Sequence, residues 1–130
     1  MRIPIIVAAL TIIVSPFSAP AAEHTADTLD AVKTAVADGS AVLLDVREQD
    51  EWDAGHLTAA KLLPLSSLKG APKADAVAKV VPKDKIVYCH CASGIRSVKA
   101  ADALKKLGYD ARPLKAGYAE LVKAGFPAAK

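Results

Sequence analysis

Apolar and polar residues follow one another in short blocks along the chain, and glycine or proline ends most of these blocks. The spacing of apolar positions predicts helices from Asp27 or Thr28 to Gly39, over 97–107 and over 118–124, with briefer helices at 48–54 and within 68–81. Apolar runs predict strands at 41–46, 61–65, 85–89 and 111–114. Ser66 and Ser67 follow the second strand and are expected to cap a helix.

Strands that alternate with helices at these spacings predict an α/β fold in three layers. We expect a central parallel sheet of about five short strands with helices on both faces. The run at 41–46 lacks polar alternation, which is typical of a strand covered on both faces. Ligands of such sheets bind beyond the carboxyl ends of the strands, so the loop after residues 85–89 is where chemistry is expected.

The N-terminal residues 1–22 have the pattern of a secretory signal peptide. Arg2 gives a positive start, residues 3–14 form an apolar run, and small residues follow, with cleavage expected after Ala21 or Ala22. An uncleaved membrane anchor is the alternative, and it would need a longer apolar stretch. We therefore expect residues 23–130 to form a single domain that is exported to the periplasm, with no stable membrane association after cleavage.

Charge and cysteine content exclude some classes of protein. The chain has 17 basic and 14 acidic residues and a formal net charge of +3, which is too weak and too scattered to indicate nucleic-acid binding. Its only two cysteines are Cys89 and Cys91, too few for a scaffold held together by disulfides. Their role is therefore chemical or local.

The segment after the third predicted strand has the composition of an anion-binding loop. Backbone N–H groups of a small-residue bend and of a helix N-terminus would point inward, and the guanidinium of Arg96 would add a full positive charge. The same field is expected to lower the pKa of Cys91 and favour a nucleophilic thiolate. We take Cys91 as the candidate nucleophile, and the residues expected to bind the substrate are Ala92, Ser93, Gly94, Ile95 and Arg96.

Several separated motifs resemble those of the rhodanese family, in the order in which that family has them. They are Leu44-Asp-Val-Arg-Glu48, Glu51-Trp52, Gly55-His56-Leu57, Ala59-Ala60 with Leu63-Pro64, Cys91-x-Ser93-Gly94-x-Arg96-Ser97, Leu114-Lys-Ala-Gly117-Tyr118 and Gly125-Phe-Pro127. The resemblance covers roughly residues 28–127, nearly all of the expected mature chain. Agreement between separated motifs is far more specific than one short match.

The resemblance implies a sulfurtransferase that carries sulfur as a persulfide on Cys91. It would take sulfur from a donor such as thiosulfate and pass it to an acceptor thiol or to cyanide. The expected partners are thus a small sulfur-containing anion or a thiol, with a protein as a second class of acceptor, and no cofactor or metal. Cys91 and Arg96 have four residues between them, whereas protein tyrosine phosphatases and related arsenate reductases need five, and the tighter ring favours sulfur over phosphate. The arginine at the end of the loop also resembles that of thiosulfate-preferring members.

Charged residues outside the loop are expected to support it. Asp45 ends a strand and Arg47 begins a turn, so we expect both to steady the active loop through pairing; a direct catalytic role is the alternative. His56 is expected to make a local hydrogen bond, and His24 is expected to lie in a solvated tail.

Cys89 departs from the simplest form of the family pattern. It is interpreted first as an inert buried strand residue, second as the partner of Cys91 in a regulatory disulfide, and third as part of a soft-metal site with His90. Two rival functions follow for the whole domain. One is a binding module without catalysis, and the other is a thiol-disulfide redox protein that uses both cysteines.

Overall fold

The computed structural model describes residues 9, 11–13, 21–70 and 73–129. Most of the predicted signal peptide lies outside these residues, so its cleavage site stays a prediction. In the part of the chain that is described, no helix has the length and apolar character needed to cross a membrane.

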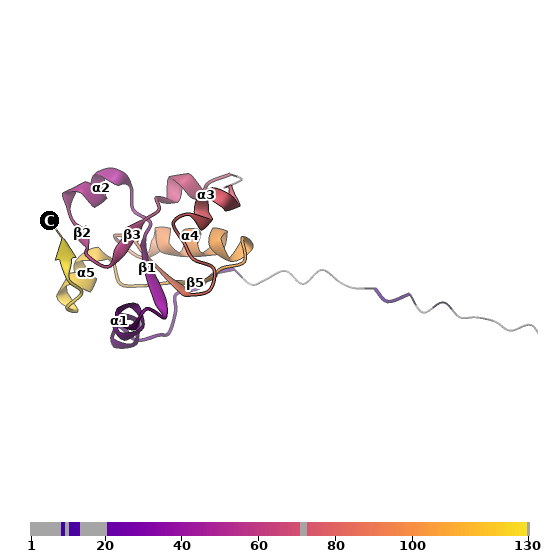
Figure 1. Cartoon of the computed structure of the whole chain (residues 1–130), viewed down its shortest axis with the longest axis horizontal. Helices are drawn as coiled ribbons and strands as arrows, with labels where there is room; N and C mark the ends of the chain where they lie inside the picture. The colour runs from indigo at the N-terminus through magenta and orange to yellow at the C-terminus, as the bar shows by residue number, and fades with distance from the viewer. Residues whose placement is uncertain (1–8, 10, 14–20, 71–72, 130) are drawn as a thin grey trace, which may run out of the picture.

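The elements are shown in Figure 1. The helices are α1 (Leu29–Asp38), α2 (Gln49–Ala54), α3 (Ala74–Ala78), α4 (Ile95–Lys106) and α5 (Tyr118–Lys123), with a 3₁₀ helix, η1 (Leu65–Leu68). The strands are β1 (Ala41–Asp45), β2 (His56–Leu57), β3 (Ala60–Leu62), β4 (Ile86–His90), β5 (Asp110–Pro113) and β6 (Ala128–Ala129).

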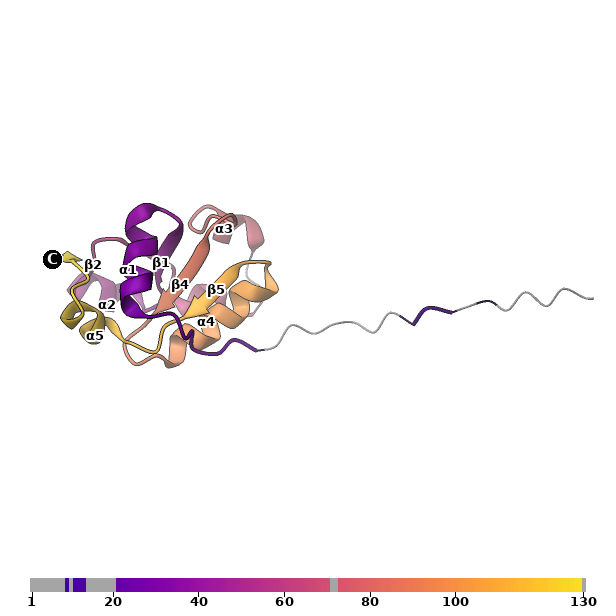
Figure 2. The same cartoon turned by 90° about the horizontal axis from the view of Figure 1, so that it is seen from below.

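A parallel sheet with the strand order β3-β1-β4-β5 forms the centre of the domain. The prediction of an α/β fold with a central parallel sheet is confirmed, but this sheet has four strands and not about five. β2 and β6 form a separate antiparallel pair, in which His56 lies opposite Ala129 and Leu57 opposite Ala128. Figure 2 places β2 and the C-terminal segment together at one end of the domain.

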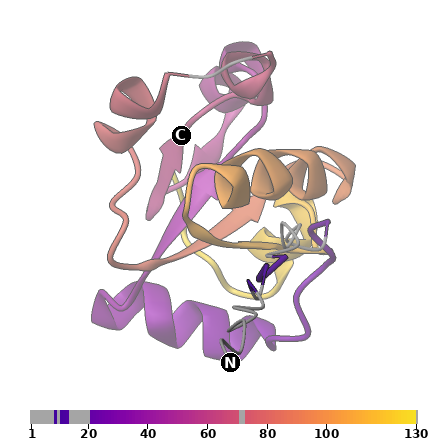
Figure 3. The same cartoon turned by 90° about the vertical axis from the view of Figure 1, so that its right-hand side faces the viewer.

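Helices cover both faces of the parallel sheet, as predicted. Figures 1 and 3 show α1 on one side of the sheet and α4 on the other. Leu43 and Leu44 are neighbours in β1, and because side chains alternate along a strand they enter two different cores. Leu44 packs with residues of α4 such as Leu104, and Leu43 packs with residues of α1 such as Val32.

The helix boundaries follow local capping rules, with two differences from the predicted ends. Thr28 caps α1 by accepting a hydrogen bond from the backbone of Ala31, at 3.1 Å. Ser66 and Ser67 lie within η1 and do not cap it from outside. α4 begins at Ile95, two residues before the predicted start, because the chain has already turned at the preceding glycine.

Candidate active site

The loop between β4 and α4 lies at the carboxyl end of the sheet, where the sequence placed the chemistry. Cys91 and Gly94 are buried, whereas Ala92, Ser93 and Ile95 are exposed. Gly94 takes the left-handed conformation, with φ +85°, and it is the residue from which α4 starts. The loop therefore turns its backbone inward and leaves most of its side chains outside.

The turn between β5 and α5 packs against this loop. The backbone N–H of Tyr118 donates a hydrogen bond to the carbonyl oxygen of Cys91 at 2.9 Å. A Cβ atom added at Gly117 would lie only 1.8 Å from the carbonyl oxygen of Ala92. The two backbones are thus in direct contact, and no side chain fits between them at position 117.

The sulfur of Cys91 is fully buried and accepts hydrogen bonds from the loop backbone. The N–H of Gly94 donates to this Sγ atom at 3.1 Å. Burial alone would raise the pKa of the Cys91 thiol, but hydrogen bonds from the backbone of Ser97, Ser93 and Gly94 and from the Ser97 hydroxyl outweigh it, so the pKa is lowered. The loop therefore favours a thiolate, the nucleophilic form of cysteine.

Arg96 lies at the loop, but its charge is not free. Its Nη1 and Nη2 atoms donate to the two carboxylate oxygens of Glu51 at 2.5 and 2.9 Å. The hydrogen bond with Glu51 raises the pKa of Arg96, and the charge of the Cys91 thiolate raises it further. The full positive charge expected from Arg96 is thus paired with a carboxylate, whereas backbone amides contact the sulfur.

Glu51 is a site-bordering residue whose role the sequence did not reveal. Besides pairing with Arg96, it accepts a hydrogen bond from the backbone N–H of Glu48 at 3.2 Å and so completes a capping box on α2. One side chain thus fixes the start of α2 and joins it to the first turn of α4. Glu51 and Arg96 belong to two motifs that the sequence shows. They are 45 residues apart, however, and nothing in the sequence indicates that their side chains pair.

The stability provided by Glu51 is expected to depend on pH. Hydrogen bonding to Arg96 lowers the pKa of Glu51 from its ordinary 4.5 to about 2 in the folded chain. A depressed carboxylate pKa stabilises the fold above pH 4.5, and this contribution is lost as the pH falls through about 2. We expect Glu51→Gln to lower the free energy of unfolding at pH 7, with the difference from wild type shrinking between pH 4.5 and 2. Urea unfolding at a series of pH values measures this.

A suitable control for Glu51→Gln is Asp102→Asn. Asp102 pairs with Lys106 within α4 at 3.3 Å, and the Lys106 side chain is highly exposed. Such a surface pair contributes about 0.3–0.5 kcal/mol, so this variant should resemble wild type. A difference for Glu51→Gln that stays constant from pH 7 to pH 2 would contradict the prediction.

Asp45 and Arg47 form a buried ion pair beneath the loop. The Arg47 Nη2 atom donates to Asp45 Oδ2 at 2.8 Å, and both side chains are almost fully buried. The Arg47 guanidinium also lies over the ring of Tyr118, 4.3 Å from its centroid, and Tyr118 is the residue whose N–H holds the carbonyl of Cys91. This arrangement favours a supporting role for the pair.

His56 and His24 both make a contact with a backbone carbonyl oxygen. His56 lies near the Trp52 carbonyl oxygen, with its Nδ1 atom at 3.0 Å, and stacks on the Trp52 ring, in agreement with a local structural role. His24 is exposed to solvent, as expected, but it is not a loose tail: its Nε2 atom lies 2.7 Å from the carbonyl oxygen of Gly94.

Cys89 and His90 lie on opposite sides of β4. Cys89 and Cys91 are both free thiols and belong to the same core cluster. Burial raises the pKa of Cys89 to about 12, which favours its interpretation as an inert strand residue. Burial also lowers the pKa of His90 to about 4, so the ring is neutral near pH 7. Within the described ranges, no three His, Cys, Asp or Glu side chains are arranged to hold a metal ion.

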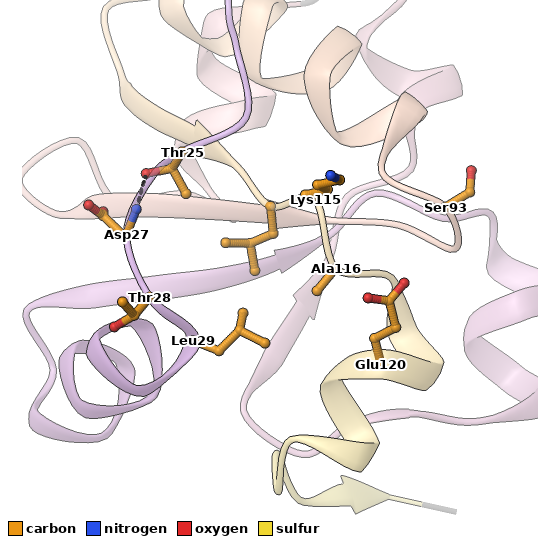
Figure 4. Close-up of a pocket in the computed structure, with 9 residues that line it drawn as sticks. Thr25, Asp27, Thr28, Leu29, Ser93, Lys115, Ala116 and Glu120 are labelled. Atoms are coloured by element: carbon orange, nitrogen blue, oxygen red, sulfur yellow. Dashed lines mark hydrogen bonds between the residues drawn. The ribbon is translucent and has the colours of Figure 1, made fainter.

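A cavity of about 450 Å³ opens beside the loop. In Figure 4, Ser93 and Glu120 lie on one side of it and Thr25 and Asp27 on the other, with Lys115 between them. Cys91 does not line this cavity, but Ser93, whose backbone N–H stabilises the thiolate, does. The volume suits a small ligand, and the lining carries both signs of charge.

Comparison with known proteins matches residues 28–124 to the rhodanese-like domain. The chain is 38% identical over 76 residues to the probable adenylyltransferase/sulfurtransferase MoeZ of Mycobacterium tuberculosis, covering 58% of this chain and 18% of that protein. It is 38% identical over 85 residues to the putative mitochondrial thiosulfate sulfurtransferase of Schizosaccharomyces pombe, covering 59% of each. The structure of the human single-domain sulfurtransferase TSTD1 has a TM-score of 0.64 and 25% identity, covering 81% of this chain and 97% of that one.

The chain thus spans only part of the length of these two curated relatives, but nearly the whole of the human single-domain protein. The names of these proteins support a sulfurtransferase-like role in broad terms. The family match covers most of the chain and agrees with the parallel sheet, the loop after β4 and the order of the motifs. This chain belongs to the rhodanese-like domain family.

Proposed function

We propose that this domain transfers sulfane sulfur from a small anionic donor such as thiosulfate to a thiol or cyanide, through a persulfide on Cys91. The observation that carries the proposal is the set of backbone N–H groups around the Cys91 sulfur, one of which donates to Sγ at 3.1 Å. These groups lower the pKa of the thiol although the side chain is buried. A persulfide anion would need donors of the same kind to hold its charge.

The proposed reaction has two displacement steps. The Cys91 thiolate attacks the outer sulfur of thiosulfate, a new S–S bond forms, the S–S bond of the donor breaks, and sulfite leaves with the electron pair. Cyanide or an acceptor thiolate then attacks the outer sulfur of the persulfide. The Cys91 thiolate is released, and the sulfur leaves as thiocyanate or as an acceptor persulfide. Each step balances without an external oxidant or cofactor.

Other residues around the loop would support these two steps by holding its backbone and a nearby charge in place. Asp45 and Arg47 would hold the turn that carries Tyr118, and through it the carbonyl of Cys91. Arg96, paired with Glu51, would keep a cation near the loop without contacting the sulfur in the resting state. The cavity that Ser93 lines is the candidate approach for the donor or acceptor.

The redox alternative needs Cys89 as a second active thiol. A thiol whose pKa is raised to about 12 is almost entirely protonated at neutral pH and attacks a disulfide slowly. The raised pKa of Cys89 favours sulfur transfer on Cys91 alone over thiol-disulfide exchange.

Replacing Cys89 tests the proposed function against this alternative. We expect Cys89→Ser to keep the thiosulfate:cyanide turnover of wild type, measured as thiocyanate formed, because its thiol takes no part in either step. We also expect neither wild type nor this variant to reduce insulin. Loss of sulfur transfer in Cys89→Ser, or insulin reduction that depends on Cys89, would overturn the assignment in favour of a redox protein.

We further propose that the domain acts in the periplasm after export. The support is the charged, apolar and small-residue pattern of residues 1–22. The mass of the intact protein recovered from cells would then correspond to a chain that begins at Ala22 or Glu23. A protein that retains Met1 and sediments with membranes would contradict this.

A further inference from the structure

The segment from Ala22 to Asp27 precedes the region matched to the family, yet it is fixed to the domain at several points. Ala22 is buried in the same core cluster as Cys91. The backbone N–H of Thr25 donates to the carbonyl of Pro113 at 2.8 Å. The Asp27 carboxylate accepts hydrogen bonds at its Oδ2 atom from the Tyr88 hydroxyl at 2.7 Å and from Arg112 at 2.9 Å. We call residues 22–27 the N-terminal strap.

Within the strap, His24 contacts the active loop directly. Its Nε2 atom lies 2.7 Å from the carbonyl oxygen of Gly94. Because a carbonyl oxygen only accepts, the hydrogen of this bond belongs to the imidazole, and Nε2–H is the donor. A Cβ atom added at Gly94 would lie 2.7 Å from the Lys115 carbonyl oxygen and 3.3 Å from His24 Nε2. Gly94 is therefore enclosed between the strap and the turn that begins at Leu114.

The carbonyl oxygen of Gly94 accepts a hydrogen bond from His24 in the strap at 2.7 Å. The Ser97 hydroxyl of α4 also lies 3.0 Å from this oxygen, but it has one hydrogen, and the Leu114 carbonyl oxygen lies equally close to it. A planar peptide group held at its oxygen has little freedom to rotate. The φ and ψ angles of Gly94 link this peptide to the preceding one, whose N–H donates to the sulfur of Cys91. The contact made by His24 thus lies one residue away from the hydrogen bond that stabilises the thiolate.

From these contacts we infer that His24 is a positioning residue: it holds the carbonyl of Gly94 and, through the backbone angles of that residue, keeps the Gly94 N–H directed at the sulfur of Cys91. The inference rests on the proposed function, because it assigns His24 to the same thiolate and persulfide site. It adds that the active loop of this chain is completed by a segment outside the family region. His24 does not contact the sulfur and takes no part in the chemical steps.

The test compares His24→Ala with His24→Gln in the protein as it is recovered from cells. The rate at which iodoacetamide alkylates Cys91 is measured against pH by peptide mass, and the midpoint of the profile gives the pKa of the thiol. We expect His24→Ala to raise this midpoint by about half to one unit, a three- to tenfold fall in the acid dissociation constant of the thiol, which is the size of effect that one hydrogen bond has. His24→Gln retains an N–H donor at similar reach and should restore most of the wild-type midpoint.

Gly39→Ala is the control for general loss of stability. Gly39 ends α1 with φ +83°, so alanine there strains the backbone, and nothing lies within 4 Å of the added Cβ atom. We expect this variant to unfold more easily without any change in the midpoint for Cys91. A midpoint for His24→Ala equal to that of wild type, or a shift that Gly39→Ala reproduces, would overturn the inference.

The outcomes also separate this inference from the proposed function. If Cys91 titrates low and responds to His24 but never accepts sulfur, the proposed function fails and the positioning role remains. If sulfur transfer occurs and His24→Ala leaves both the midpoint and the turnover unchanged, the function remains and the positioning role fails.

Discussion

Cys91→Ser is expected to abolish sulfur transfer from thiosulfate to cyanide. A serine hydroxyl at this position has almost no anionic form near neutral pH, and it cannot form the S–S bond that the first step requires. Loss of a nucleophile that forms a covalent intermediate typically costs a thousandfold or more in turnover, so we expect a fall of at least roughly 10³. Thiocyanate formation under saturating thiosulfate measures this.

The matched control for this variant is the same substitution two residues away. Cys89→Ser replaces an equally buried thiol of the same core cluster, so it controls for the effect of placing a hydroxyl there. We expect it to keep turnover. Equal turnover in wild type and Cys91→Ser would show that any activity arises elsewhere, and it would favour a binding module that keeps the fold without the chemistry.

Asp45→Ala is expected to cause the largest loss of stability. Asp45 is fully buried, and its Oδ1 atom accepts hydrogen bonds from both the backbone N–H and the Nε of Arg47, each at 3.0 Å. Removing one partner of a buried pair leaves the other charge buried without compensation, which costs about 3–5 kcal/mol. Because Arg47 also lies over Tyr118 beneath the loop, we expect reduced turnover in whatever fraction stays folded. Urea unfolding of both proteins gives the free-energy difference.

A second aspartate pair provides the comparison. Asp110 pairs with Arg112 at 3.0 Å, but the Asp110 side chain is 54% exposed, so Asp110→Ala should cost no more than about 1 kcal/mol. If Asp45→Ala does not fold, Asp45→Asn replaces it, because asparagine keeps the shape of the side chain and one acceptor oxygen. Its loss of unfolding free energy should lie between that of Asp110→Ala and the about 3–5 kcal/mol expected for Asp45→Ala. A loss for Asp45→Ala as small as that for Asp110→Ala would contradict a supporting role for the buried pair.

The sequence was sufficient for the sheet and the major helices because their signals are local. The run from Ala41 to Val46 is long enough to identify a buried strand, and the structure has β1 there. Gly39 was identified as the end of the first helix, and it takes the left-handed conformation that glycine tolerates best. The cysteine loop was also locatable, because a strand, small residues and a helix follow one another within a few positions.

Features that depend on distant partners could not be predicted. β2 and β6 have two residues each, too few to show a period, and they are far apart in sequence. Glu51 was visible as part of a motif, but its pairing with Arg96 depends on how α2 is placed against α4. His24 lies among alanines and threonines with no pattern around it, so only the folded chain shows that it reaches Gly94.

The mass of the peptide that contains Cys91, taken from the purified domain after incubation with thiosulfate and removal of excess donor, tests the central claim most directly. The expected result is the addition of one sulfur atom, removed again by cyanide and absent in Cys91→Ser. A peptide that keeps the mass of the unmodified thiol, under conditions in which the domain is folded, would contradict the assignment of Cys91 as a sulfur carrier.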